Sequence, residues 1–152
     1  MFEMEGIHHV SLSITDIHEA RQFYSTILGL AEIERPDFGF PGIWYQVGEQ
    51  QLHLTVHPAS DTLRPKSVVE TKAGHFAIRV KDYDQTLHYL KQSGVQLVEK
   101  PESKSGFAQI FCLDPDNNVI ELNVDQADLQ RCSRVCRDLY KDEKKLANEV
   151  LG

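Results

Sequence analysis

Apolar and polar residues alternate along residues 7–14, which places two different sets of side chains on the two faces of a β-strand. The period changes at Asp16, whose carboxylate can cap a helix together with Glu19 three residues later. Apolar residues then recur at helical spacing until Gly29, a residue typical of a helix end. This segment therefore predicts a strand followed by an amphipathic helix.

A hairpin and a linker follow in the first half of the chain. Residues 35–42 are rich in proline and glycine and predict a loop. The two alternating stretches 43–47 and 51–57 flank the polar turn 48–50, which is typical of a β-hairpin. Residues 58–72 contain prolines and serines and predict a linker.

The second half of the chain repeats the first. His9–Asp16 aligns with His75–Asp82, which lies 66 positions later. Leu52–Val56 aligns with Ile120–Val124, which lies 68 positions later, so the two offsets differ only by a small loop insertion. The other predicted elements of the second half are a helix from Asp82 to Gly94, strands at 95–98, 107–113 and 119–124, and a turn at 114–118. The chain is therefore a diverged tandem repeat.

This pattern predicts an α+β fold with two tandem βαβββ modules, at about residues 6–57 and 73–124, joined by the linker 58–72. Helices on one side of the strands leave the polar faces on the other side, where a curved mixed sheet can surround a metal pocket. We expect residues 1–125 to form a single domain. Residues 126–152 predict a C-terminal amphipathic helix that docks on its own domain or on a partner subunit.

Composition and charge narrow the function. The 152 residues are 41% hydrophobic and 26% charged, which is ordinary for a globular protein. A formal net charge of −7 argues against a nucleic-acid partner, because nucleic-acid affinity comes largely from Lys and Arg. There is no apolar stretch of membrane-spanning length and no signal-like start, so we expect a cytoplasmic protein without a membrane partner. The three cysteines are odd in number and predict free thiols.

The candidate chemistry lies at equivalent points of the two modules. His9 and His75 occupy the first strand of each module, and His53 and Glu121 occupy the last strand, all on polar faces. A single strand histidine is weak evidence, since it more often makes ordinary hydrogen bonds. Three imidazoles and a carboxylate at matched positions are good donors to a divalent metal such as Zn, Ni, Mn, Fe or Co. The alternative is a buried polar network.

Several short segments together resemble the vicinal oxygen chelate superfamily, which includes glyoxalase I, fosfomycin-resistance thiol transferases, extradiol dioxygenases and metal-free bleomycin-resistance proteins. The segments that carry the resemblance are Ile7–Val10, Phe23-Tyr24, Leu28–Leu30, Gly74–Ala77, Asp114–Asp116 and Ile120–Leu122. The resemblance covers about Gly6 to Asn123.

By this resemblance, His9, His75 and Glu121 stand where the family's most persistent metal ligands stand. His53 stands where glyoxalase I carries a glutamate that also moves the substrate proton. His53 is therefore a fourth ligand, a general base or a group that supports the ligands, and Glu121 is the other candidate base.

The resemblance implies a metal that holds two neighbouring oxygens of a small-molecule substrate. Our first hypothesis is a glyoxalase-like lyase or isomerase, with a thiol adduct as one form of its substrate. The enzyme alternatives are fosfomycin-type thiol transfer and extradiol dioxygenation. The alternative of a different class is a drug-binding protein without turnover. Relatives often form homodimers, which makes a homodimer the expected assembly.

The predicted substrate-lining residues follow from the polar faces of the strands. Those with the strongest expectation are Ser11, Trp44, Gln46, Thr55, Arg79, Gln109 and Asn123. The loop aromatics Phe38 and Phe40 are interpreted as packing residues. Arg35 is interpreted as a solvated loop charge, with recognition of an anionic group as the alternative.

Overall fold

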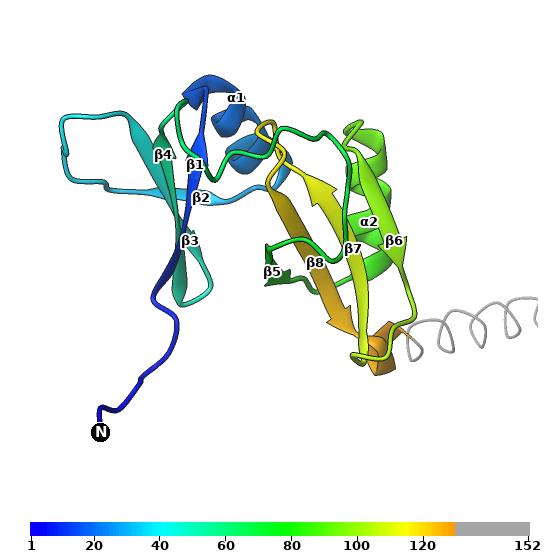
Figure 1. Ribbon diagram of the computed structural model, residues 1–152. Helices are drawn as coiled ribbons and strands as arrows, with labels where there is room; N and C mark the ends of the chain where they lie inside the picture. Colours follow the sequence, from blue (N-terminus) through cyan, green and yellow to red (C-terminus); the bar gives the residue numbers. More distant parts are fainter. Residues whose placement is uncertain (130–152) are drawn as a thin grey trace, which may run out of the picture.

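The computed structural model describes residues 1–129 of the chain. The first module consists of β1 (His9–Ile14), α1 (Ile17–Arg21), the π-helical turn η1 (Gln22–Ile27), β2 (Ala31–Ile33), β3 (Gly42–Val47) and β4 (Gln50–Val56). The second consists of β5 (His75–Arg79), α2 (Tyr83–Gln92), β6 (Leu97–Lys100), β7 (Phe107–Leu113) and β8 (Val119–Asp125). The predicted α+β class and the tandem βαβββ plan are confirmed (Figure 1).

The two modules form two four-stranded sheets with the same topology. The strand orders are β1-β4-β3-β2 and β5-β8-β7-β6. In each sheet the first strand runs parallel to the last, and the other neighbours are antiparallel. β1 and β5 are therefore equivalent edge strands, and each carries one of the predicted histidine ligands.

Matching side-chain caps begin the two helices. The Asp16 carboxylate accepts hydrogen bonds from the backbone N–H groups of His18 at 2.6 Å and Glu19 at 3.0 Å. In the second module, the Asp82 carboxylate accepts one from the backbone N–H of Gln85 at 2.9 Å. Each bond satisfies a donor that the first turn of a helix leaves without a partner, so both predicted helix starts are confirmed.

Three local predictions differ from the structure. The helix expected to continue to Gly29 is α-helical only to Arg21 and then widens into η1, where the adjacent rings of Phe23 and Tyr24 are both buried. The first strand begins at His9 because Ile7 is 71% exposed and has no core to join. The strand expected at 95–98 spans Leu97–Lys100 instead. Such shifts of a few residues are common at element ends.

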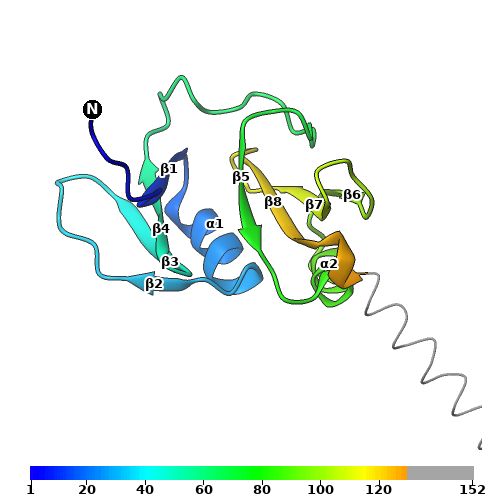
Figure 2. The same ribbon diagram turned by 90° about the horizontal axis from the view of Figure 1, so that it is seen from below.

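The core extends across both modules. Tyr24, Leu54, Leu90 and Ile120 are each at most 1% exposed and belong to one continuous apolar cluster. Figures 1 and 2 both show α1 between the two sheets, while α2 packs on its own sheet. The apolar sides of the sheets therefore face the helices, as predicted, which leaves their polar sides for the candidate site.

The Asp-Pro-Asp turn before β8 joins the modules through buried hydrogen bonds. The Tyr24 hydroxyl donates to Asp114 Oδ2 at 2.7 Å. The backbone N–H and hydroxyl of Thr15 donate to Asp116 Oδ1 at 3.0 and 2.6 Å. Burial raises the pKa of the Asp114 carboxyl, while hydrogen bonds from Asn118 and Tyr24 oppose the rise. This turn belongs to the family resemblance, and here its carboxylates bind the other module.

The helices of the described part are short. The longest, α2, has 10 residues. No helix within residues 1–129 has the length and apolar character needed to cross a bilayer. Residues 126–129 are helical, and the rest of the expected C-terminal helix lies outside the described residues.

Cys112 is a free and fully buried thiol on β7. Burial, with a smaller effect of the Asp114 charge, raises its pKa to about 12, so the thiolate does not form near neutral pH. Cys112 is thus a free thiol, as predicted. The other two cysteines, Cys132 and Cys136, lie outside the described residues.

Candidate metal centre

The second module brings His75 and Glu121 into contact. β5 and β8 pair in parallel with Ala77 opposite Glu121. His75 is two residues before Ala77, so its side chain lies on the same face of the sheet as that of Glu121. The distance from His75 Nε2 to Glu121 Oε2 is 3.2 Å, and the Glu121 residue is 4% exposed. A strand register that follows from the sequence repeat thus places an imidazole against a buried carboxylate.

The tautomer of His75 gives this contact its chemistry. The Nδ1 atom lies 2.7 Å from the backbone oxygen of Ala73, which accepts only, so Nδ1 must carry a proton. In the neutral ring Nε2 then has a lone pair and no proton, and it faces a carboxylate oxygen that is also an acceptor. Neither atom can donate a hydrogen bond to the other. The contact becomes favourable when a cation lies between the two atoms or when the ring gains a second proton. Ligand histidines are commonly oriented by such a bond from their other nitrogen.

Two amides hold the Glu121 carboxylate. Gln109 Nε2 donates to Oε2 at 2.8 Å, and Asn123 Nδ2 donates to Oε1 at 2.6 Å. Gln109 lies on β7 and Asn123 lies on β8, and the two are paired across the strands. Both were predicted to contact substrate. In the structure they orient Glu121, which is a supporting role that strand alternation alone does not reveal.

The first module forms a row of stacked rings instead. His53 lies between Trp44, at a centroid distance of 4.0 Å, and His9, at 4.2 Å. His8 meets His9 edge-on, and their Nδ1 atoms are 2.9 Å apart. His53 Nε2 lies 2.8 Å from the Gln51 side-chain oxygen. Among residues 1–129, no such contact is made by His9 Nε2 or His53 Nδ1, so these are the nitrogens available to a ligand.

The surroundings of His53 favour its neutral form by lowering its pKa. Burial is the largest cause that lowers its pKa, and the neighbouring charges of His9, His8 and Arg35 lower the pKa further. A neutral imidazole is the form that binds a metal or accepts a proton. Both functions predicted for His53 are therefore compatible with its environment. Gln51, which sequence reasoning did not single out, orients the ring.

The four predicted ligands form two pairs in a single chain. Within residues 1–129, no group of three or more His, Cys, Asp or Glu side chains is close enough to hold a metal ion. The reason is that His9 and His53 belong to the first sheet, and His75 and Glu121 belong to the second, which is a separate sheet. Each pair therefore supplies half of the expected ligand set.

Two cavities lie between the edge strands β1 and β5, and His75 lines both. One has a volume of about 360 Å³ and also contacts Ser11 and Ser13. The other has a volume of about 620 Å³ and also contacts Gln51. Their sizes are those of small-molecule sites. The smaller cavity therefore brings the predicted lining residue Ser11 near His75, which belongs to one of the two ligand pairs.

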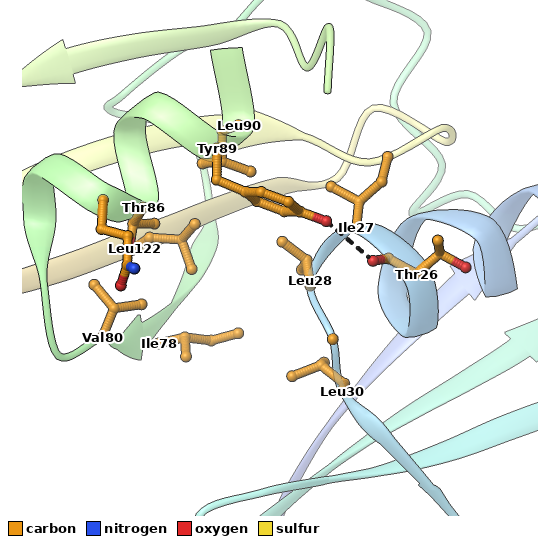
Figure 3. Close-up of a pocket in the computed structure, with 12 residues that line it drawn as sticks. Thr26, Ile27, Leu28, Leu30, Ile78, Val80, Thr86, Tyr89, Leu90 and Leu122 are labelled. Atoms are coloured by element: carbon orange, nitrogen blue, oxygen red, sulfur yellow. Dashed lines mark hydrogen bonds between the residues drawn. The ribbon is translucent and has the colours of Figure 1, made fainter. Parts of the chain in front are cut away.

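A third cavity, of about 420 Å³, lies on the helix side between the end of η1 and α2 (Figure 3). Its walls are mainly apolar, with Leu28, Leu30 and Ile78 among them. The Tyr89 hydroxyl donates to the backbone oxygen of Thr26 at 3.3 Å across this space. No predicted ligand lines it. We therefore interpret it as a packing seam between the modules.

Other predicted lining residues have protein partners. The Gln46 amide donates to the backbone oxygens of Gly48 and Gln50 at the hairpin turn. Arg79 pairs with Asp125 at 3.3 Å and lies over a phenylalanine ring. Thr55 lies across from Ser13 on the same polar face, two residues beyond His53. These positions surround the two pairs, and their contact with substrate stays a prediction.

Comparisons with known proteins support the family resemblance and the fold. The family model described as Glyoxalase/Bleomycin resistance protein/Dioxygenase superfamily matches residues 6–122. "Glyoxylase I 4" of Arabidopsis thaliana is 26% identical over 122 residues, which cover 78% of this chain and 70% of that protein. "Glutathione transferase FosA" of Serratia marcescens is 26% identical over 123 residues, which cover 80% and 82%. The crystal structure of a glyoxalase family protein from Bacillus anthracis has a TM-score of 0.69 at 24% identity, over 82% of this chain and 98% of that chain.

Proposed function

Because the chain belongs to the glyoxalase/bleomycin resistance protein/dioxygenase superfamily, we propose that it is a metal-dependent, glyoxalase-like lyase or isomerase acting on a small oxygenated substrate. The observation that carries the proposal is the contact between His75 and Glu121. A lone pair of Nε2 faces a carboxylate oxygen at 3.2 Å, while Nδ1 is committed to the Ala73 carbonyl. This pair is prepared for a cation.

We propose that the metal is held by His75 and Glu121 together with His9, and with His53 as a fourth ligand or a base. When bound there, a divalent cation would supply Lewis-acid polarisation of two neighbouring oxygens of the substrate. These four side chains fit such a cation because neutral imidazoles and a carboxylate suit divalent first-row metals.

The protein side chains divide the remaining work. The Gln109 and Asn123 amides hold Glu121 in one orientation. Glu121 is the first candidate to remove a proton next to the polarised group. His53 is the second candidate, since its pKa is lowered and its Nδ1 is available. Ser11 lines the same cavity as His75 and is the proposed partner of a substrate oxygen. The Ser13 hydroxyl, which also lines this cavity, already donates to the Ser60 hydroxyl at 2.8 Å.

We further propose that two copies of the chain complete the site. The described residues of one chain hold the ligands as two pairs on separate sheets. β1 and β5 are both edge strands, and such edges are natural places for another chain to pair. If β1 of one copy lies beside β5 of the other, His9 approaches His75. A symmetric homodimer formed in this way has two equivalent sites.

Metal analysis tests the proposed function. Purified protein dialysed against Zn, Ni, Mn, Fe(II) or Co should bind metal stoichiometrically, and His75→Ala and Glu121→Ala should lose it. His88→Gln is a matched control, because His88 is an exposed histidine of the same module on α2. Failure to bind any of these metals, or full metal content in Glu121→Ala, would contradict the proposal.

Activity assays then identify the reaction. The metal-loaded protein should convert the adduct of methylglyoxal and glutathione if it is a glyoxalase-like lyase. Thiol transfer to fosfomycin is the second candidate, which the FosA relative supports. Ring opening of catechols would instead indicate the dioxygenase alternative. If thiol transfer to fosfomycin is the one reaction observed, the lyase assignment would be wrong and the proposed metal site would still hold.

A further inference from the structure

The ring row of the first module continues into the loop between β2 and β3. Phe38 lies 5.8 Å from Trp44 and 5.7 Å from Phe40, measured between ring centroids. The Arg35 guanidinium carbon lies over both loop rings, 4.8 Å from the centroid of Phe38 and 5.1 Å from that of Phe40. Arg35 is thus held by two cation–π contacts rather than extended into solvent.

Gly42 explains why Arg35 can lie there. A Cβ atom at position 42 would be 2.9 Å from Arg35 Nε and 2.5 Å from the backbone oxygen of Leu54. Gly42 lies on β3 two residues before Trp44 and pairs with Thr55, so it shares the face of Trp44 and His53. The guanidinium therefore occupies the space of the missing side chain, on the same face as the candidate ligands.

The positive charge of Arg35 has no counter-ion in the described part of the chain. Each of the arginines Arg21, Arg64 and Arg79 has a carboxylate within 4 Å, and Arg35 has none. The strands β1, β3 and β4 that form this polar face contain no Asp or Glu. Arg35 Nη1 donates only to the backbone oxygen of Pro36, at 3.3 Å.

The hydrogen bonds of Arg35 are also incomplete. Its Nε is the one buried side-chain nitrogen or oxygen without a partner among residues 1–129. Buried polar groups are nearly always paired, so an exception calls for a reason. Nη2 is not buried and makes no hydrogen bond within the described residues, which leaves it open to a ligand.

We propose that Arg35 binds an oxyanion of the substrate, a carboxylate or a phosphate-type group joined to a flat apolar body that rests on Phe38 and Phe40. The two rings are 49% and 46% exposed, which leaves room for such contact. A planar guanidinium is well matched to these anions. The proposal rests on the proposed function for the identity of the ligand as substrate. It makes Arg35 and its two rings the specificity residues of the first module.

The test uses Trp44 as the reporter, because it is the single tryptophan of the chain and lies beside Phe38. Metal-free and metal-loaded protein are titrated with benzoate, phenyl phosphate and the neutral analogue benzamide, and tryptophan fluorescence is followed. Benzoate or phenyl phosphate should bind about tenfold tighter than benzamide, which is the effect of one charge-assisted contact. The anion that binds more tightly indicates whether the substrate carries a carboxylate or a phosphate-type group.

The variants separate this proposal from the proposed function. Arg35→Gln should abolish the preference for the anion, Arg35→Lys should keep part of it, and Arg21→Gln is the control because its charge is paired with Glu32 outside the site. Anion binding that is equal in wild type and Arg35→Gln, or that occurs only with metal, would overturn the role of Arg35 and leave the metal enzyme intact. If the protein cannot bind metal but prefers the anion, and this preference depends on Arg35, the role of Arg35 is supported and the proposed metal enzyme is contradicted. Circular dichroism confirms that each variant is folded.

Discussion

The two modules share one topology and carry different chemistry. At the equivalent positions 9 and 75 both have a histidine, but the last strand has His53 in the first module and Glu121 in the second. In the first module the surroundings are rings, with Trp44 stacked on His53 at 4.0 Å. In the second module, the amides of Gln109 and Asn123 donate hydrogen bonds to the Glu121 carboxylate. The two modules therefore share the positions of the candidate ligands and differ in the residues around them.

This contrast assigns a different task to each module. In the proposed site, the second module would supply the negative ligand, Glu121. The first would supply imidazole donors and a face that contains Arg35 and no acid on β1, β3 or β4. A substrate between them would meet a cation and Arg35, both of which attract anionic oxygens. The two faces are therefore complementary only when they are brought together.

Mixing two inactive variants gives the largest expected effect. His9→Ala disables the half-site of the first module, and Glu121→Ala disables that of the second. If two copies share each site, a hybrid dimer has one intact site and one that lacks both groups. Random refolding of an equal mixture should restore about a quarter of the wild-type sites, as symmetry requires. Metal content and activity of the mixture are the measurements.

The matched control mixes His75→Ala with Glu121→Ala, which damage the same half-site and should show no recovery. Native mass spectrometry confirms that hybrids have formed. A hybrid without any recovery would mean that each chain closes its own site, and the two-copy arrangement would be wrong.

The sequence repeat predicted the parts of the site that follow from strand register. The offset between the modules placed His75 beside Glu121 and His9 near His53, because alternation and pairing fix which side chains share a face. It could not predict how the two sheets lie relative to each other, which depends on packing of α1 between them (Figure 2). For that reason the four expected ligands appear as two pairs.

Arg35 shows a second limit of sequence reasoning. Its place in a loop rich in proline and glycine favoured a solvated charge. The structure places it over Gly42 and against Phe38, where a missing Cβ makes the space. That outcome depends on a glycine seven residues later and on loop closure, neither of which has a periodic signal. The supporting amides of Gln109 and Asn123 were recognised as polar lining, while their bonds to Glu121 were not.

A smaller effect is expected from the groups that hold Glu121. Asn123→Ala removes the hydrogen bond to Oε1, so the carboxylate keeps only the hydrogen bond from the Gln109 amide. Loss of such a supporting contact typically weakens metal binding by about 10- to 100-fold. Competition with a chelator measures the affinity. Gln96→Ala, which alters an exposed amide bonded to Ser67, is the control and should bind metal like the wild type. Equal affinity in Asn123→Ala would contradict the supporting role of Asn123 in metal binding.

The smallest effect concerns the hydrogen bond that joins the modules. Tyr24→Phe removes the donor to the buried Asp114 carboxylate and should lower the free energy of unfolding at pH 7 by about 1.5–3 kcal/mol. Tyr45→Phe is the control, since it removes a 3.0 Å bond to the Ser25 hydroxyl within one module and should cost only about 0.5–1.5 kcal/mol. Urea denaturation of both variants gives the values.

The pH dependence of this loss gives the sharper test. The Tyr24 hydroxyl opposes the rise in the pKa of Asp114 that burial causes, so Tyr24→Phe should raise that pKa further. The native variant then keeps its proton to higher pH than the native wild type. As the pH falls from 7 toward the ordinary carboxyl range, the variant gains stability relative to the wild type, because its native state binds the extra proton. The difference between the two proteins should therefore narrow at acid pH, whereas that of Tyr45→Phe should stay constant. A Tyr24→Phe difference that stays constant on acidification would mean that Asp114 is already protonated at neutral pH and that the modules are joined by a neutral hydrogen bond.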